Sequence, residues 1–90
     1  MLPTVIQVFS TRSFDLIISF DDGKVVRWNA KHLLLAGGVF EKIKNPEVFH
    51  NELTVLNGTV AWSHDFDPET CVDLDPLVLY HEGVDIRQPV

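Results

Sequence analysis

Cysteine is almost absent from the chain, and this bounds the class of protein. Cys71 is the only cysteine in 90 residues, so an internal disulfide is excluded, together with the cross-linked framework of small secreted domains. Long apolar runs are also missing, because the longest, residues 33–40, falls far below the ~18 residues that a membrane span needs. Residues 1–4 lack the basic start of an export signal. We therefore expect a cytoplasmic protein without a membrane segment.

Basic side chains are scarce, and their scarcity limits the choice of partners. Seven Lys and Arg against thirteen Asp and Glu give a net charge of -6. Phosphate binding needs clustered cations, so a direct nucleic-acid partner is disfavoured. Residues 1–62 carry six basic and six acidic groups, whereas residues 63–90 carry seven acids and a single Arg. This acidic third would attract a basic partner, although a solvated surface that keeps the protein soluble gives the same composition.

A first hairpin is predicted from alternating apolar residues. Residues 14–20 place every second side chain on one apolar face, which is typical of a half-buried strand, and residues 24–28 return after Asp21-Asp22-Gly23. A three-residue loop with Gly23 in the left-handed conformation keeps the best apolar residues on one face, whereas a two-residue loop would split them. The expected cross-strand pairs are Ile18 with Val26 and Leu16 with Trp28.

A second hairpin is predicted around Asn57-Gly58, because this dipeptide suits the positive φ angles of a type I′ turn. Its strands are residues 53–56 and 59–62. The expected pairs are Val55 with Val60 and Leu53 with Trp62. The β-rich residues 4–9 add an N-terminal strand beside the first hairpin.

Short helices are expected between and after the hairpins. Asn29 is placed to cap a turn over residues 31–36 that ends at Gly37-Gly38, and residues 39–43 give a second brief helical face. An Asn or Asp residue followed by proline predicts further helix starts. These pairs are Asn45-Pro46, Asp67-Pro68 and Asp75-Pro76. The sequence thus predicts a single α+β domain over residues 1–90, with a small antiparallel sheet built from two hairpins plus an N-terminal strand.

The His/Asp-rich segment 64–81 is the strongest candidate for chemistry. Its possible metal ligands are His64, Asp65, Asp67, Asp73, Asp75 and His81. Their spacing matches neither a calcium-binding loop nor a His-x3-His helix face. Ser63-His64-Asp65 is consecutive, so these side chains diverge along an extended segment. We expect no catalytic residue, no metal and no cofactor; a small-ligand-binding or metal-dependent enzyme that uses segment 64–81 stays as the alternative.

The order of several short motifs carries a resemblance to a known family. The motifs are Leu16-x-Ile18-x-Phe20-x-Asp22-Gly23, Phe40, Pro46-x-x-Phe49, Gly58-Thr59-Val60-x-Trp62 and Asp75-Pro76-x-x-Leu79-Tyr80. In this order the chain resembles the bacterial family catalogued as domain of unknown function 2442. It differs by a longer acidic stretch over residues 66–73 and by having no helix-turn-helix after Tyr80, which some relatives carry.

The resemblance implies a small α+β domain with an antiparallel sheet and no established activity. Some relatives are encoded beside a small basic protein, as in toxin–antitoxin pairs, which would make this chain antitoxin-like. We therefore expect a cytoplasmic protein-interaction module that binds a small basic protein, and a homodimer formed through exposed strand edges is plausible. The residues expected on the partner surface are Asp65, Asp67, Asp73, Asp75 and Glu82.

Overall fold

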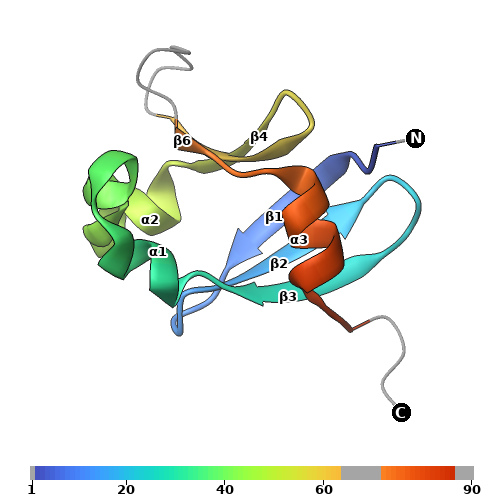
Figure 1. Cartoon of the computed structure of the whole chain (residues 1–90), viewed down its shortest axis with the longest axis horizontal. Helices are drawn as coiled ribbons and strands as arrows, with labels where there is room; N and C mark the ends of the chain where they lie inside the picture. Colours follow the sequence, from blue (N-terminus) through green and yellow to red (C-terminus); the bar gives the residue numbers. More distant parts are fainter. Residues whose placement is uncertain (1, 64–71, 87–90) are drawn as a thin grey trace.

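The computed structural model describes residues 2–63 and 72–86 of the chain. In chain order its elements are β1 (Val5–Ser10), β2 (Asp15–Phe20), β3 (Val25–Asn29), α1 (Lys31–Ala36), the 3-10 helix η1 (Gly38–Lys44), α2 (Pro46–Asn51), β4 (Leu53–Leu56), β5 (Thr59–Trp62), β6 (Val72–Asp73), α3 (Pro76–Glu82) and β7 (Val84–Asp85). Antiparallel strands and short helices therefore make an α+β fold, as the sequence predicts (Figure 1).

The first sheet has the strand order β1-β2-β3-β7, and the predicted hairpin forms its centre. The pairs Ile18 with Val26 and Leu16 with Trp28 are confirmed. The turn is a three-residue loop, because Phe20 N donates to Lys24 O at 2.8 Å and Gly23 has a φ of 92°. The predicted N-terminal strand is also confirmed, since β1 pairs with β2. The alternation of residues 14–20 thus determines which side chains enter the core.

The second sheet has the order β4-β5-β6 and contains the Asn57-Gly58 hairpin. Its pairs, Val55 with Val60 and Leu53 with Trp62, are those predicted from the sequence. Both turn residues have positive φ angles, 53° and 74°, as a type I′ turn requires.

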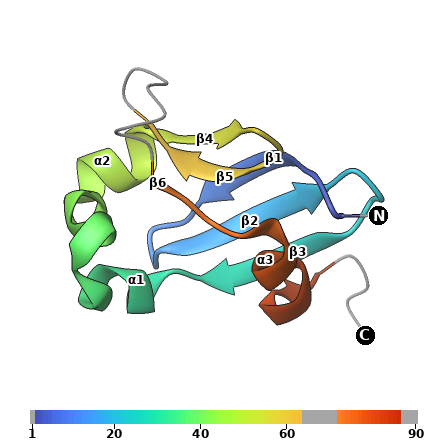
Figure 2. The same cartoon turned by 45° about the horizontal axis from the view of Figure 1, so that its top comes forward.

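The two hairpins lie in separate sheets, whereas the sequence predicts one. The second hairpin lies against β1 (Figure 2), and Val5 N donates to Gly58 O at 2.8 Å. A β-bulge in β1 between Val5 and Gln7 interrupts the regular ladder near this contact. Turn chemistry specifies how each hairpin pairs with itself but does not specify how one hairpin meets the other.

The predicted helix caps are largely confirmed. Asn45 Oδ1 accepts from Glu47 N at 2.9 Å, and Asp75 Oδ1 accepts from Leu77 N at 2.9 Å. Asn29 Oδ1 accepts from Lys31 N at 3.1 Å, although the residue at the cap position of α1 is Ala30. Asp67-Pro68 lies outside the described residues.

The strands β6 and β7 escape sequence analysis, because two residues are too short to show a period. β7 pairs with β3, so the chain returns to the first sheet after α3. Among the described residues, no helix combines the length and the apolar character that crossing a membrane requires.

The core lies between the inner face of the first sheet and the elements that cover it. Leu16, Ile18, Phe20, Val26 and Trp28 are buried on that inner face. The large, fully buried side chains of the covering elements are Ile43, Phe49, Val60, Trp62 and Leu79. Both tryptophans lie in the core, as predicted, and Trp62 Nε1 donates to Phe49 O at 2.9 Å, which joins the second sheet to α2.

Gly83 lies at the C-terminal end of α3, against Val26 of β3. Its φ of -65° and ψ of 146° are open to any residue, so backbone conformation does not require glycine here. A Cβ at this position would lie 2.5 Å from Val26 Cγ2 and 2.8 Å from Leu79 O. Gly83 therefore allows the C-terminal end of α3 to rest on the sheet.

We predict that Gly83→Ala destabilises the protein by about 1–3 kcal/mol, because the added methyl group overpacks this contact. Urea unfolding measures the change through the midpoint at a constant slope. The control is Leu35→Ala, which alters a side chain that is 86% exposed and should change stability by less than about 0.5 kcal/mol. If Gly83→Ala were as stable as the unaltered chain, the close contact between position 83 and Val26 would be refuted.

Candidate functional site

Helix α3 lies at the surface and separates two open hollows. Asp75 caps its start and Pro76 occupies its first turn, and the apolar side of the helix buries Leu79 in the core. Leu77 and Val78 remain exposed. Residues three or four positions apart share a face of a helix, so α3 presents one set of side chains to each hollow.

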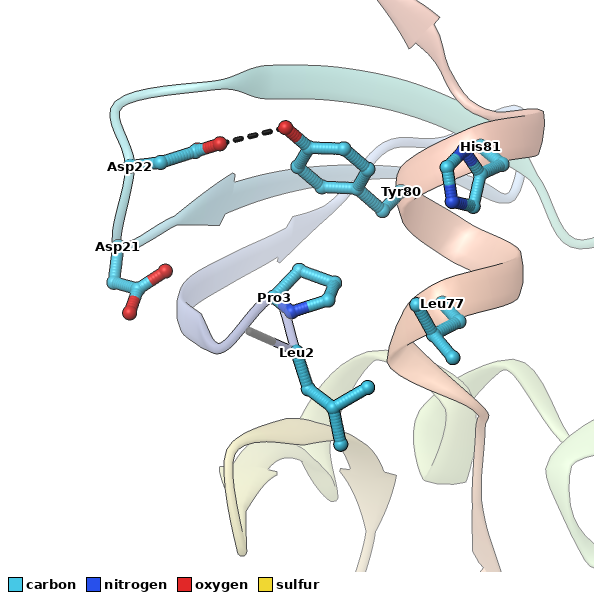
Figure 3. A pocket seen from close by; sticks show the side chains of 7 residues that line it. All are labelled: Leu2, Pro3, Asp21, Asp22, Leu77, Tyr80 and His81. Atoms are coloured by element: carbon cyan, nitrogen blue, oxygen red, sulfur yellow. Dashed lines mark hydrogen bonds between the residues drawn. The ribbon is translucent and has the colours of Figure 1, made fainter.

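The first hollow, here called the Asp22 groove, lies between α3, the N-terminal segment and the β2–β3 turn (Figure 3). Its volume is about 280 Å³. The residues that line it are Leu2, Pro3, Asp21, Asp22, Leu77, Tyr80 and His81. Two carboxylates from the turn therefore face apolar side chains from the helix and the N-terminal segment.

Tyr80 ties the wall of the Asp22 groove to the first hairpin. Its hydroxyl donates to Asp22 Oδ2 at 2.6 Å, as Figure 3 shows. Lys24 Nζ lies 4.0 Å from the centre of the Tyr80 ring and donates to Tyr80 O at 2.8 Å. The ring of Phe20 packs against the same ring with a centroid distance of 5.0 Å. These contacts hold α3 in a fixed position relative to the turn.

The second hollow, here called the Trp28 groove, lies on the other side of α3 towards α1 and has a volume of about 230 Å³. The residues that line it are Trp28, His32, Leu33, Leu74, Asp75, Val78, Leu79 and Glu82. The rings of Trp28 and His32 meet edge to face at 4.9 Å. Trp28 Nε1 lies 3.5 Å from Glu82 Oε1, the long limit of a hydrogen bond. An apolar floor thus has carboxylates at its rim.

The structure brings two of the five predicted partner residues together. Asp75 and Glu82 line the Trp28 groove. Asp73 is exposed on β6, where it pairs with Ala61, and it does not line the groove. Asp65 and Asp67 lie outside the described residues.

The alternative is a metal-dependent site in segment 64–81. The structure describes this segment only from residue 72 onwards. His81 lines the Asp22 groove, across α3 from Asp75 in the Trp28 groove. Within residues 2–63 and 72–86, no three His, Cys, Asp or Glu side chains are grouped to hold a metal ion.

The contribution of Asp21 and Asp22 to this surface cannot be predicted from the sequence alone. The local pattern indicates turn residues of a charge-balanced segment, but the fold places them beside α3. Carboxylates therefore flank both sides of the helix, and those of Asp21 and Asp22 come from outside the C-terminal third of the chain. Asp22 and Tyr80 both belong to the motifs that carry the family resemblance, and this was the available signal for their pairing.

Comparison with known proteins gives one result. The family model described as "Protein of unknown function (DUF2442)" matches residues 5–85, which include both hairpins, α3 and every residue of the two grooves except Leu2 and Pro3. No curated protein and no solved structure matches the chain.

We predict an energetic coupling between Tyr80 and Asp22. In a double-mutant cycle, Tyr80→Phe and Asp22→Ala should show a coupling energy of about 1 kcal/mol, because they share a charge-assisted hydrogen bond. The control cycle combines Tyr80→Phe with Asp21→Ala, the neighbouring carboxylate, and should be additive within about 0.3 kcal/mol. Thermal or urea unfolding of the variants measures both cycles, and equal coupling in the two would show that the Asp22 contact does not hold α3.

Proposed function

The chain belongs to the DUF2442 family, whose description assigns no function, and we propose that it is a protein-interaction module whose α3 surface binds a cationic, partly apolar segment of another protein. The observation that carries this proposal is the Trp28 groove, in which Asp75 and Glu82 stand beside an apolar floor. An apolar floor and charged rim are the usual anatomy of a binding surface for protein segments.

The size of the grooves favours a side chain over a free small molecule. Small-molecule pockets usually measure roughly 300–1,000 Å³, and both grooves, at about 230 and 280 Å³, are smaller and open. Inserting one Leu, Val or Phe side chain into such a floor contributes about 1.5–3 kcal/mol. One apolar anchor in either groove therefore supplies part of the binding free energy, and further contacts along the segment must offset its lost translational and rotational freedom.

The carboxylates determine which segment binds. Asp21, Asp22, Asp75 and Glu82 stand at the two grooves, with Lys24 engaged by Tyr80. Each exposed ion pair of this kind contributes only about 0.2–1 kcal/mol, but several together favour a basic partner over an acidic one and accelerate the encounter with it. Lys or Arg beside the apolar anchor matches this rim. In the cytoplasm, a small basic protein would supply such a segment, which is the chemistry of an antitoxin-like role.

The experiment uses two amphipathic peptides that share the same Leu positions, one with Lys and one with Glu at the polar positions. Amide signals of the ¹⁵N-labelled chain are followed by NMR during each titration. We predict that the Lys peptide shifts signals of α3 and of residues that line the grooves, and that its affinity falls when salt rises from about 0.05 M to about 0.5 M, because rim charges are screened. The Glu peptide should bind at least tenfold more weakly.

Two matched double variants distinguish the effect of the charges at the Trp28 groove from the effect of the net charge of the chain. Asp75→Asn with Glu82→Gln should weaken the Lys peptide about tenfold, which corresponds to about 1.4 kcal/mol, while Asn keeps the cap of α3. The control, Glu41→Gln with Glu47→Gln, removes the same charge from η1 and α2 and should change affinity less than about twofold. Equal weakening by the two double variants, or shifts that lie away from α3, would refute the proposal.

A further inference from the structure

The first sheet has a second face, here called the outer face, on which none of the described elements packs. α3 and the second sheet contribute to one core with the inner face and lie on the same side of the sheet (Figures 1 and 2). On the outer face, Phe9 lies opposite Ile17, Ile17 opposite Arg27, and Arg27 opposite Val84. These residues form one row across all strands of the sheet. Its two ends are well exposed, with Phe9 at 56% and Val84 at 65%.

A second row runs beside the first. Gln7 pairs with Ser19 and Ser19 with Val25, and Ile86 N donates to Val25 O at 2.9 Å. Neither Ile17 nor Val25 belongs to the core or packs against it. The apolar residues of the outer face are Phe9, Ile17, Val25, Val84 and Ile86. These apolar side chains share the face with Gln7, Ser19 and Arg27, and apolar side chains gathered on one uncovered sheet face favour an interaction site.

The charge of the outer face indicates its occupant. Alternation along the described strands places Arg27 and Asp15 on this face, so the strands contribute no net charge to it. The whole chain carries a net charge of -6, and two copies therefore repel each other through their acidic surfaces. A basic partner is attracted to the α3 side instead. We propose that the outer face is the surface through which two copies of this chain associate, packed face to face about a two-fold axis.

The positions of Arg27 and Asp15 suit such an axis. Arg27 lies opposite Ile17, and Asp15 lies two residues before Ile17 on β2, so the two charged residues are diagonal neighbours about 7–8 Å apart. Contacts in a two-fold interface are reciprocal. An axis that passes between these residues brings Arg27 of each copy to Asp15 of the other. The apolar side chains of the two rows then meet each other around the charged pairs.

The size of the outer face sets the strength of the dimer. Strands about 4.8 Å apart and up to six residues long cover roughly 20 Å by 20 Å, or about 400 Å². A standard interface buries about 800 Å² on each partner. The dimer is therefore weak and forms at micromolar concentrations. It leaves the grooves beside α3 open on both copies, because they lie on the opposite side of the sheet.

Analytical ultracentrifugation over about 10 μM to 1 mM tests the proposal, with an expected monomer–dimer equilibrium of Kd about 10–100 μM. Phe9→Ser with Val84→Ser should raise this Kd at least tenfold without changing net charge. The control, Leu2→Ser with Leu35→Ser, removes exposed apolar side chains elsewhere and should leave the Kd within about twofold. NMR spectra of both double variants show whether they stay folded.

A charge exchange tests the two-fold arrangement. Arg27→Asp and Asp15→Arg should each raise the Kd at least fivefold, and the variant with both changes should return it towards that of the unaltered chain. A chain that remains monomeric at the highest concentration, or a dimer that the Phe9 and Val84 changes leave intact, would overturn the proposal. So would a monomer that binds neutral lipid vesicles through its outer face. Failure of the double exchange to restore association would overturn the reciprocal pairing.

Discussion

The packing of α3 on the inner face of the first sheet is the contact on which the candidate site depends. A helix of seven residues is marginal on its own, so its position comes from tertiary contacts. Leu79 is buried in the core, Tyr80 binds Asp22 of the first hairpin, and Gly83 allows close contact with Val26. The two grooves exist because this helix stands at a fixed distance from the turn on one side and from α1 on the other. Loss of these contacts would remove both grooves.

The features that the sequence predicts well are those decided within a few residues. Alternation together with Gly23 determines the register of the first hairpin, and Asn57-Gly58 determines that of the second. Asn45 and Asp75 cap their helices through the backbone two residues ahead. The division into two sheets and the short strands β6 and β7 depend on contacts between distant segments. A strand of two residues has no period, and only its partner, here β3 for β7, makes it a strand.

In the candidate site, too, local features can be predicted from the sequence and contacts between distant segments cannot. The acidic character of residues 63–90 pointed to Asp75 and Glu82, which do share a groove. Asp22 and Tyr80 are 58 positions apart, and no local pattern joins them. Charge counted along the chain also differs from charge arranged in space, because Asp21 and Asp22 come from the balanced segment and still stand beside α3. Composition therefore predicts a basic partner, and the fold places two of the predicted residues, Asp75 and Glu82, at one groove.

The α3 surface is acidic, whereas the strands contribute no net charge to the outer face of the first sheet. This difference in charge links the two proposed interactions. Repulsion between two copies of a chain with a net charge of -6 opposes association even through a neutral outer face. A basic segment bound beside α3 makes the net charge less negative without covering Arg27 or Val84 on the outer face. Partner binding would then strengthen self-association, and by reciprocity a dimer would hold its basic partner more tightly. The coupling needs no conformational change, since long-range charge alone connects the two sides of the sheet, and it weakens as salt shortens the range of that field.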